Sequence, residues 1–273
     1  MNNRAIVTAA HIIPTLFEGE IQVLRNEEII TIQLDELTTS DYLIYPLNKL
    51  SKKLVWKGVE LFYNNHIEIS NKLPLEDTRF WYLIGRFVGD GWITKRTSRN
   101  NNISGIKICC SHTEVDDLKN KFGNLFKYTL IKERTVYKFQ FSNKELGVFC
   151  CKLGIGAKNK VIPKEIIDMP VVYLKPIMEG LIDSDGTFTQ GKYKLTTISR
   201  ELAYSFADLS LKVTGIPFKI YFYERPRKAV IEGRVVNQND TYQVVIYENY
   251  SKKYQFLDDN NMYCKVRRIL KVE

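Results

Sequence analysis

Two short stretches of this chain repeat one pattern of small residues, aspartate and glycine. In each stretch two small residues stand four positions apart, and an aspartate and a glycine follow. The members are Gly85, Gly89, Asp90 and Gly91 in the first stretch and Gly180, Ser184, Asp185 and Gly186 in the second. Small residues four apart lie on one face of a helix and let another backbone approach closely. The repeat therefore predicts two helices that pack against each other.

The aspartates of the repeat are expected in the last turn of each helix, because the glycines that follow suit a left-handed C-terminal cap. If the helices pair side by side, Asp90 and Asp185 meet at one end of their interface. Like charges repel, and a helix C-terminus adds partial negative charge, so this position is costly. Divalent cations relieve the cost, and carboxylate oxygens are ligands that Mg²⁺ prefers. The pattern predicts a metal site.

The second stretch, Met178 to Gly186, resembles the LAGLIDADG motif almost letter for letter, and the first keeps its Gly85 and Gly89-Asp90-Gly91 skeleton. The chain thus resembles the double-motif LAGLIDADG homing endonucleases, which are single chains with two pseudo-symmetric halves that cut both strands of a long DNA site. The two aspartates are 95 positions apart, which fits the length of the family's repeated unit.

The resemblance implies an α+β fold of two αββαββα units with antiparallel, saddle-shaped sheets. The units are expected over residues 76–168 and 169–273, the second with a basic C-terminal tail. Alternation supports this: Ile106 and Ile108 lie on one side of an expected strand and Lys107 on the other. The expected order in the first unit is helix, hairpin, helix, hairpin, helix.

Residues 1–75 form a smaller β-rich region. Within it Thr8-Ala9-Ala10-His11 and Ser40 to Pro46 resemble part of the splicing domain of an intein. The upstream nucleophile and the terminal His-Asn of an intein are missing, so we expect that this chain does not splice itself. Two interpretations stay open for the region, a relic of an intein or an accessory DNA-binding region.

Two lysine elements extend the resemblance. Lys160-Val161-Ile162-Pro163 resembles the element that precedes the second motif in intein endonucleases, and Ser251 to Tyr254 resembles the Ser-Lys-Lys-aromatic element of the family. The family interposes a helix before that second element, whereas here a strand precedes it. The resemblance implies a catalytic set of Asp90, Asp185, Lys160 and Lys253. It also implies a Mg²⁺ site, with Mn²⁺ as a substitute, at Asp90, Asp185, Gly89 and Ser184.

The net charge of +9 points to a polyanionic partner. Long polar side chains alternate along the expected strands, where they suit base edges, and loop cations suit phosphates. The simple alternative is the solvated side of a sheet. The expected contacts to double-stranded DNA are Thr94-Lys95, Arg96, Arg99, Lys107, Lys138, Gln140, Lys192, Lys194, Lys219, Tyr221, Tyr223, Arg225 and Arg227.

Other classes of protein are disfavoured by the sequence. No apolar run approaches the roughly 20 residues of a membrane-spanning helix, and the start is a poor signal peptide, so we expect an intracellular protein without membrane contact. The five cysteines lack zinc-ligand spacing, which favours reduced, buried thiols.

The expected function is metal-dependent cleavage of both strands of a long DNA target, with short 3′ overhangs, by a monomer with internal pseudo-two-fold symmetry. An intron maturase that binds RNA and a cleavage-inactive DNA-binding protein of the same fold are alternatives. A self-splicing intein and a basic structural protein are further alternatives of other classes.

Overall fold

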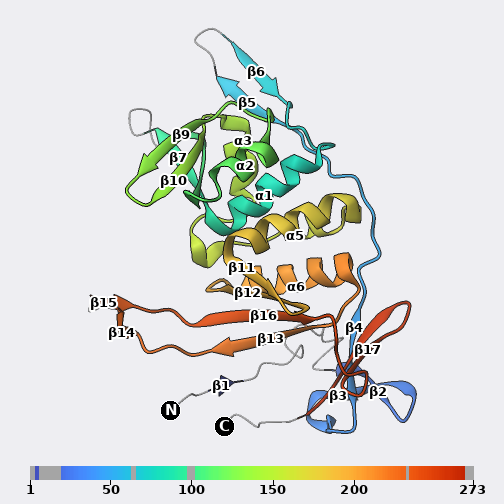
Figure 1. The fold of residues 1–273 in the computed structure, drawn as a ribbon. Coiled ribbons are helices and arrows are strands. Elements are labelled where there is room, and N and C mark those ends of the chain that lie inside the picture. Colours follow the sequence, from blue (N-terminus) through green and yellow to red (C-terminus); the bar gives the residue numbers. More distant parts are fainter. Residues whose placement is uncertain (1–3, 6–19, 63–65, 97–101, 232–233, 268–273) are drawn as a thin grey trace.

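Two helices packed side by side form the centre of the molecule (Figure 1). They are α1 (Thr78–Asp90) and α5 (Val171–Asp185), the two helices that the repeated pattern predicts. The structure is a computed structural model that describes residues 4–5, 20–62, 66–96, 102–231 and 234–267. Every residue of α1 from Phe80 to Val88 is buried, because neighbours cover the helix on several sides.

The first half has the order of elements that was predicted. After α1 come β7 (Gly91–Arg96), β8 (Asn102–Ser111), α2 (Val115–Phe122), β9 (Thr129–Glu133), β10 (Val136–Phe141) and α3 (Lys144–Cys151). The strands form an antiparallel sheet in the order β7-β8-β10-β9. Ile106 and Ile108 are fully buried and Lys107 is not, which confirms the predicted alternation.

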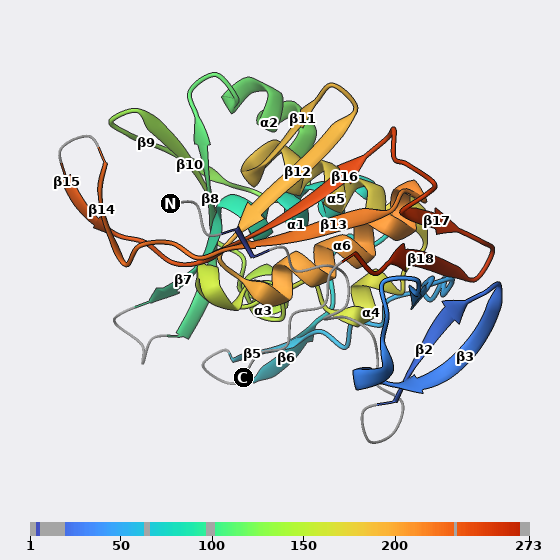
Figure 2. The same ribbon diagram turned by 90° about the horizontal axis from the view of Figure 1, so that it is seen from below.

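A linker with the short helices η3 (Ala157–Asn159) and α4 (Lys164–Ile167) leads into the second half. After α5 this half contains β11 (Gly186–Thr189), β12 (Lys192–Thr197), α6 (Arg200–Thr214), β13 (Phe218–Tyr223), β14 (Lys228–Ile231), β15 (Arg234–Asn237) and β16 (Thr241–Tyr247). Its sheet has the order β1-β13-β16-β12-β11, where β1 (Arg4–Ala5) is added from the start of the chain. The hairpin β14–β15 continues β13 and β16 outward as an arm (Figures 1 and 2). Mixed helices and antiparallel sheets confirm the α+β class.

A third sheet joins the N-terminal region to the end of the chain. It consists of β2 (Glu20–Arg25), β3 (Glu28–Gln33), β4 (Tyr42–Pro46), β17 (Gln255–Leu257) and β18 (Asn261–Lys265), in the order β17-β18-β4-β2-β3. The turn η2 (Leu34–Glu36) follows β3. The pairing of β18 with β4 groups residues 255–265 with the N-terminal strands, although the sequence grouped them with the second unit. The predicted β-rich character of the N-terminal region is confirmed.

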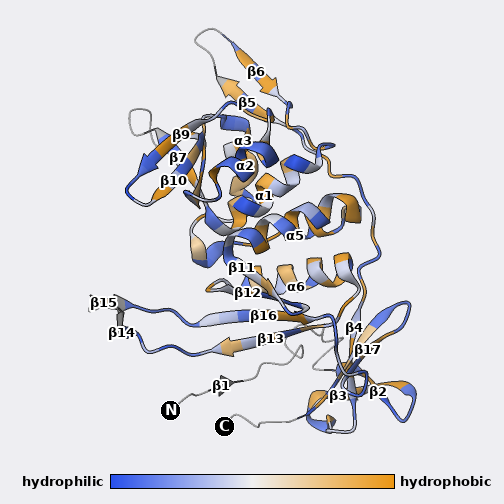
Figure 3. Ribbon diagram, viewed as in Figure 1, coloured by the Kyte–Doolittle hydropathy of each residue, from blue (hydrophilic) through white to orange (hydrophobic). Residues whose placement is uncertain are grey.

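A separate hairpin, β5 (Val59–Phe62) and β6 (Ile67–Ser70), projects from the first half. Figure 3 shows that it carries hydrophobic residues, and Ile67 and Ile69 are exposed. Its base is fixed by the buried carboxylate of Glu145, which accepts hydrogen bonds from Trp56, Ser70 and the Lys72 amide. The segment before the first motif is thereby attached to α3.

Within the described residues, no helix has the length and the apolar character needed to cross a membrane. All five cysteines are free, and Cys110, Cys150 and Cys264 are buried. The motif Thr8-Ala9-Ala10-His11 lies outside the described residues, so the interpretation of the N-terminal region as an intein relic stays a prediction.

Candidate functional site

The seam between α1 and α5 depends on its glycines. A β-carbon at Gly85 would lie 2.2 Å from the carbonyl oxygen of Ile177, and one at Gly180 would lie 2.3 Å from that of Tyr82. Such distances leave no room for a methyl group, so each helix approaches the backbone of the other through its glycine. The predicted close packing of the two motif helices is confirmed.

The same seam brings the two aspartates to one end. Asp90 ends α1 and Asp185 ends α5. Between them lies Gly89, where a β-carbon would be 2.0 Å from Oγ of Ser184 and 3.4 Å from Oδ2 of Asp185. Gly89 and Ser184 therefore meet here, as do Asp90 and Asp185, and these are two of the pairs that the sequence singled out.

The left-handed conformation that was predicted for the glycine after each motif helix is wrong. Gly91 and Gly186 have φ values of −104° and −107°, which are extended and not left-handed. The chain passes straight from helix into strand, from α1 into β7 and from α5 into β11. Glycine is still required, since a β-carbon at Gly91 would lie 2.6 Å from the carbonyl oxygen of Phe87.

The surroundings of Asp90 and Asp185 disfavour the charged form of both carboxylates. Burial and the charge of Asp185 raise the pKa of Asp90 to about 6, against the opposing effect of Arg86. Burial also raises the pKa of Asp185, although Lys160 and Arg86 oppose the shift. Two partly buried acids with raised pKa values attract cations.

Lys160 comes to this site from the linker, as predicted. Its ammonium group donates hydrogen bonds to the carbonyl oxygens of Phe87, at 2.8 Å, and Gly91, at 3.0 Å. It lies 3.9 Å from the centroid of the Phe87 ring and is buried. Burial lowers the pKa of Lys160 to about 8, while Cys150, Asp185 and Asp90 oppose the shift. The lysine thus caps the last turn of α1 beside the aspartates.

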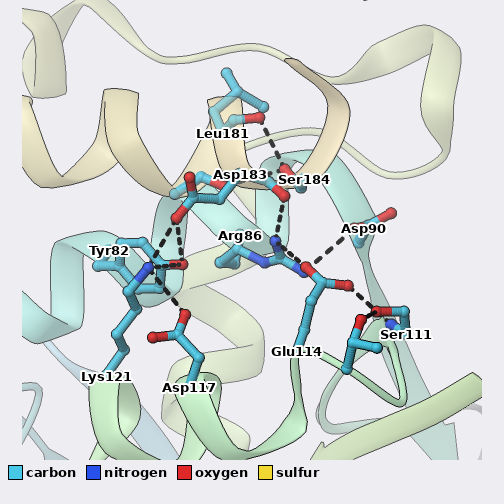
Figure 4. A network of polar contacts seen from close by, with 12 residues as sticks. Tyr82, Arg86, Asp90, Ser111, Glu114, Asp117, Lys121, Leu181, Asp183 and Ser184 are labelled. Atoms are coloured by element: carbon cyan, nitrogen blue, oxygen red, sulfur yellow. Dashed lines mark hydrogen bonds and ion pairs between the residues drawn. The ribbon is translucent and has the colours of Figure 1, made fainter. Parts of the chain in front are cut away.

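A second cation, Arg86, was not expected from the sequence. It lies one turn before Asp90 in α1, and its Nη2 atom is 3.5 Å from Oδ2 of Asp90 (Figure 4). Its Nη1 atom donates to Glu114, at 3.0 Å, and to the carbonyl oxygen of Asp183, at 2.6 Å. The available signal was a charged residue inside an otherwise apolar helix, which is rarely buried unless it is paired.

Asp183, the other acid of the second motif, has separate partners. Its carboxylate accepts hydrogen bonds from Tyr82, at 2.8 Å, and from Lys121, at 2.9 Å (Figure 4). Lys121 also pairs with Asp117 on α2. This acid therefore ties α5 to the first half and is not left open for a ligand.

The remaining donors fit a hard divalent cation. Asp90 and Asp185 lie at the end of the seam, and Gly89 lies against the side chains of Ser184 and Asp185. In the part of the chain that the structure describes, no group of three or more His, Cys, Asp or Glu side chains is close enough to enclose a metal. Such an open site suits Mg²⁺, which keeps several waters and binds through one or two carboxylates plus phosphate oxygens.

Lys253 is not brought to the aspartates. Its carbonyl oxygen accepts a hydrogen bond from Tyr42, and its ammonium lies 5.7 Å from the ring centroid of Tyr254. Figure 1 shows β17, which follows it, beside β4 and below α6, whereas Asp185 ends α5 where that helix leads into β11. The physical reason is the pairing of β17 with β18 and of β18 with β4, which holds this segment in the N-terminal sheet.

The first sheet has one polar face, on the side away from its buried residues. Trp92, Lys107 and Gln140 are paired across β7, β8 and β10 in one row. Lys138 shares the face and lies 5.4 Å from the ring centroid of Trp92, and it also pairs with Glu133. The sequence predicted the lysines and the glutamine of this row but missed Trp92.

Not all predicted contacts of this half can be placed. Lys95 is exposed and Thr94 receives a hydrogen bond from Ser104. Arg99 and the side chain of Arg96 lie outside the described part of the chain.

The second sheet also has a polar face, opposite the side packed on α6. Lys192 and Lys219 approach the ring of Tyr247 from two strands, at 5.1 Å and 5.5 Å from its centroid. Tyr221 pairs with Gln243 across β13 and β16. The predicted residues Lys194 and Tyr223 share this face, and the sequence missed Tyr247 and Gln243.

The arm beyond this sheet carries the predicted arginines. Arg225 lies 5.7 Å from the ring centroid of Tyr223, and its backbone amide donates a hydrogen bond to the carboxylate of Asp240. Arg227 pairs with the same aspartate at 3.3 Å and is otherwise exposed. Both cations are thus fixed where the arm leaves the sheet.

Comparison with known proteins finds similarity in sequence to a family profile and to a curated protein. A profile of the LAGLIDADG-like domain matches residues 177–255. A search of curated proteins finds reverse gyrase of Thermococcus kodakarensis, which is 31% identical over 113 residues. That match covers 41% of this chain and only 6% of the length of the reverse gyrase.

Among solved structures, mesophilic variants of the homing endonuclease I-DmoI match with 16% identity and a TM-score of 0.42, covering 63% of this chain and 89% of theirs. Full-length WhiA from Thermatoga maritima matches with 12% identity and a TM-score of 0.37, covering 63% of this chain and 51% of its own. The matched residues 177–255 resemble a LAGLIDADG-like domain, and they contain the second copy of the repeated motif, whose Gly180 lies in the helix seam.

Proposed function

We propose that this protein is a site-specific DNA endonuclease that requires a divalent cation and breaks both strands of a long duplex target. The observation that carries the proposal is the meeting of Asp90 and Asp185 at one end of the seam, with Lys160 beside them. The homing endonuclease I-DmoI has been solved in complex with DNA and calcium and in complex with DNA and manganese, the partner and ion class proposed here.

The chain's residues divide the work of such a reaction. Asp90 and Asp185, with the main chain of Gly89 and Ser184, would hold Mg²⁺ or Mn²⁺. Once bound, the cation would polarise the scissile phosphate and activate water. Lys160 and Arg86 supply positive charge next to the carboxylates, which offsets negative charge that develops on the phosphate.

The two polar sheet faces supply DNA binding in this proposal. Their cations would contact phosphates, which gives most of the affinity and makes it depend on salt. Trp92, Gln140, Gln243 and Tyr247 would face bases or sugars and contribute specificity. The arm with Arg225 and Arg227 would extend the contact on the second half only.

Several finer features belong to the same proposal. We infer a monomer whose units span residues 76–168 and 169–273, short 3′ overhangs in the product, and an intracellular location. Residues 1–75 would act as an accessory DNA-binding region or persist as the relic of an intein. Lys253 would take part in catalysis only if its segment moved, because it now lies beside Tyr42.

The test is incubation of the protein with a randomised duplex pool and Mg²⁺, followed by sequencing of the cut ends. Asp90→Asn and Asp185→Asn should abolish double-strand cleavage and leave binding of the selected site largely intact. Asp116→Asn, at an exposed aspartate on α2, is the matched control and should cut normally. Undiminished cutting by Asp90→Asn or Asp185→Asn would refute the assignment, and binding without cutting by the unaltered protein would favour a cleavage-inactive DNA-binding protein.

A further inference from the structure

Arg86 makes the two halves of the site chemically unequal. In the repeated pattern it follows Gly85, and the residue that follows Gly180 in the second helix is Leu181. Both side chains are almost completely buried. One motif helix therefore places a cation where the other places an apolar side chain.

The contacts of Arg86 leave part of its guanidinium group without a hydrogen bond. Only Nη1 has such partners, Glu114 and the carbonyl oxygen of Asp183, whereas Nε and Nη2 are buried without a hydrogen-bond partner, and Nη2 has only the longer ion pair with Asp90. Unsatisfied buried donors on a charged group are costly, and an apolar residue of similar volume is often at least as stable there. Stability therefore does not account for an arginine at this position.

Glu114 holds the guanidinium group at Nη1, so that Nη2 faces Asp90. Glu114 accepts from Nη1 of Arg86, and its other oxygen accepts from the amide of Ser111 at 2.8 Å (Figure 4). Although burial opposes it, these hydrogen bonds keep the pKa of Glu114 below its usual range. With Nη1 fixed in this way, Nη2 lies 3.5 Å from Oδ2 of Asp90.

We propose that Arg86 is a positioning residue that contacts and orients the carboxylate of Asp90, whereas it acts on Asp185 only through its charge, so that the two DNA strands are hydrolysed at unequal rates. The inference rests on the proposed nuclease function and deepens it. The second motif helix has no such positioning residue, because Leu181 at the matching position offers no hydrogen-bond donor. Removing the charge of Arg86 should slow the cleavage of one DNA strand much more than the cleavage of the other.

The experiment uses the full-length protein, a supercoiled plasmid that carries the selected target, and strand-specific end labels. Arg86→Met should change the ratio of the two strand-cleavage rates by about tenfold or more, so that nicked circles accumulate. Arg86→Lys, which keeps the charge, should restore part of the original ratio. Tyr82→Phe is the matched control, because it removes a contact to Asp183 in the same network without reaching Asp90.

The outcomes separate positioning from a structural role. If Arg86→Met slows both strands by the same factor, or neither, the proposal is overturned. If Arg86→Met does not fold, Glu114→Gln decides the question, since it weakens the contact that holds Arg86 from the partly exposed residue just before α2. That variant should shift the same ratio in the same direction, and an equal loss on both strands would overturn the proposal. Absence of any cleavage by the unaltered protein would refute the nuclease function itself, and this inference with it.

Discussion

Gly85 and Ile177 meet across the helix seam at a distance that no side chain tolerates. A β-carbon at position 85 would stand 2.2 Å from the carbonyl oxygen of Ile177. Because this contact is to backbone, it cannot be relieved by rotating a side chain. The seam places both aspartates, so its packing governs the site as well as the fold.

Gly85→Ala should therefore separate the helices. We expect a loss of about 2 to 4 kcal/mol in the free energy of unfolding, measured by urea denaturation. Gly156→Ala is the contrast, because a β-carbon there meets nothing within 4 Å and only the positive φ of 80° opposes it. Its cost should be about 1 kcal/mol. Equal stability of the two variants would show that the seam is less tight than the contact implies.

Lys160→Met should reduce both stability and cleavage. The carbonyl oxygens of Phe87 and Gly91 lose the hydrogen bonds from the ammonium group, and a hydrogen bond to a charged group contributes about 1 to 3 kcal/mol. Because burial lowers the pKa of Lys160 to about 8, its positive charge is lost as the pH rises through that value. Cleavage by the unaltered protein should fall above about pH 8, and the residual activity of Lys160→Met should lack this alkaline decline. Lys158→Met, at an exposed position, should behave like the unaltered protein.

The seam and its aspartates could be predicted because their signal is local. Small residues four apart fix a helix face, and an aspartate five positions after the first of them falls at the helix end. Lys160 could be predicted as well, because it stands in the recognisable element Lys160-Val161-Ile162-Pro163. The alternation around Lys107 likewise gave the buried and polar faces of the first sheet.

The features that the sequence did not give are those that depend on distant pairing. Nothing in the residues around Tyr263 shows that β18 pairs with β4, more than 200 positions earlier, and this pairing is what carries Lys253 away from Asp185. The extended conformation of Gly91 depends on where the chain goes next, and a glycine alone permits either conformation. The role of Arg86 emerged only once α2 placed Glu114 beside it.

The charge of Asp90 should cost stability in the metal-free protein. Its pKa is raised to about 6 in the folded state, so the folded protein binds the proton more tightly than the unfolded chain. The protonated carboxyl of Asp90 therefore contributes stability to the folded state at low pH. This contribution is lost as the pH rises from about 4 to about 6 and the group becomes charged. Asp90→Asn removes this loss. Since about a third of the side chain is exposed, we expect a gain of only about 1 kcal/mol at pH 7.5 and none at pH 4.

Thermal denaturation in EDTA at both pH values checks this expectation. Added Mg²⁺ should then raise the melting temperature of the unaltered protein and not that of Asp90→Asn, because a ligand stabilises only the state that binds it. A stabilisation of equal size at pH 4 and pH 7.5 would mean that charge is not the cause.

Glu145 should hold the projecting β5–β6 hairpin and its base. Its buried carboxylate accepts from Trp56, Ser70 and the amide of Lys72, so Glu145→Ala leaves three donors unpaired. We expect a loss of about 2 to 4 kcal/mol and faster proteolysis within residues 52–72. Glu60→Ala, at an exposed position on β5, is the control. Unchanged proteolysis of the Glu145 variant would place the anchor elsewhere.

The two polar sheet faces should contribute separately to DNA affinity. Lys107→Gln alters the row of Trp92 and Gln140 in the first sheet, and Lys192→Gln alters the contact with Tyr247 in the second. If each lysine neutralises one phosphate, each variant should lower the slope of log affinity against log salt by about 1, and the double variant by about 2. Fluorescence anisotropy with a labelled duplex between low and moderate salt measures the slope. Lys119→Gln, whose lysine pairs with Asp116 on α2, should leave it unchanged. A slope that changes for Lys119→Gln but not for the sheet variants would move the DNA interface to the helical side.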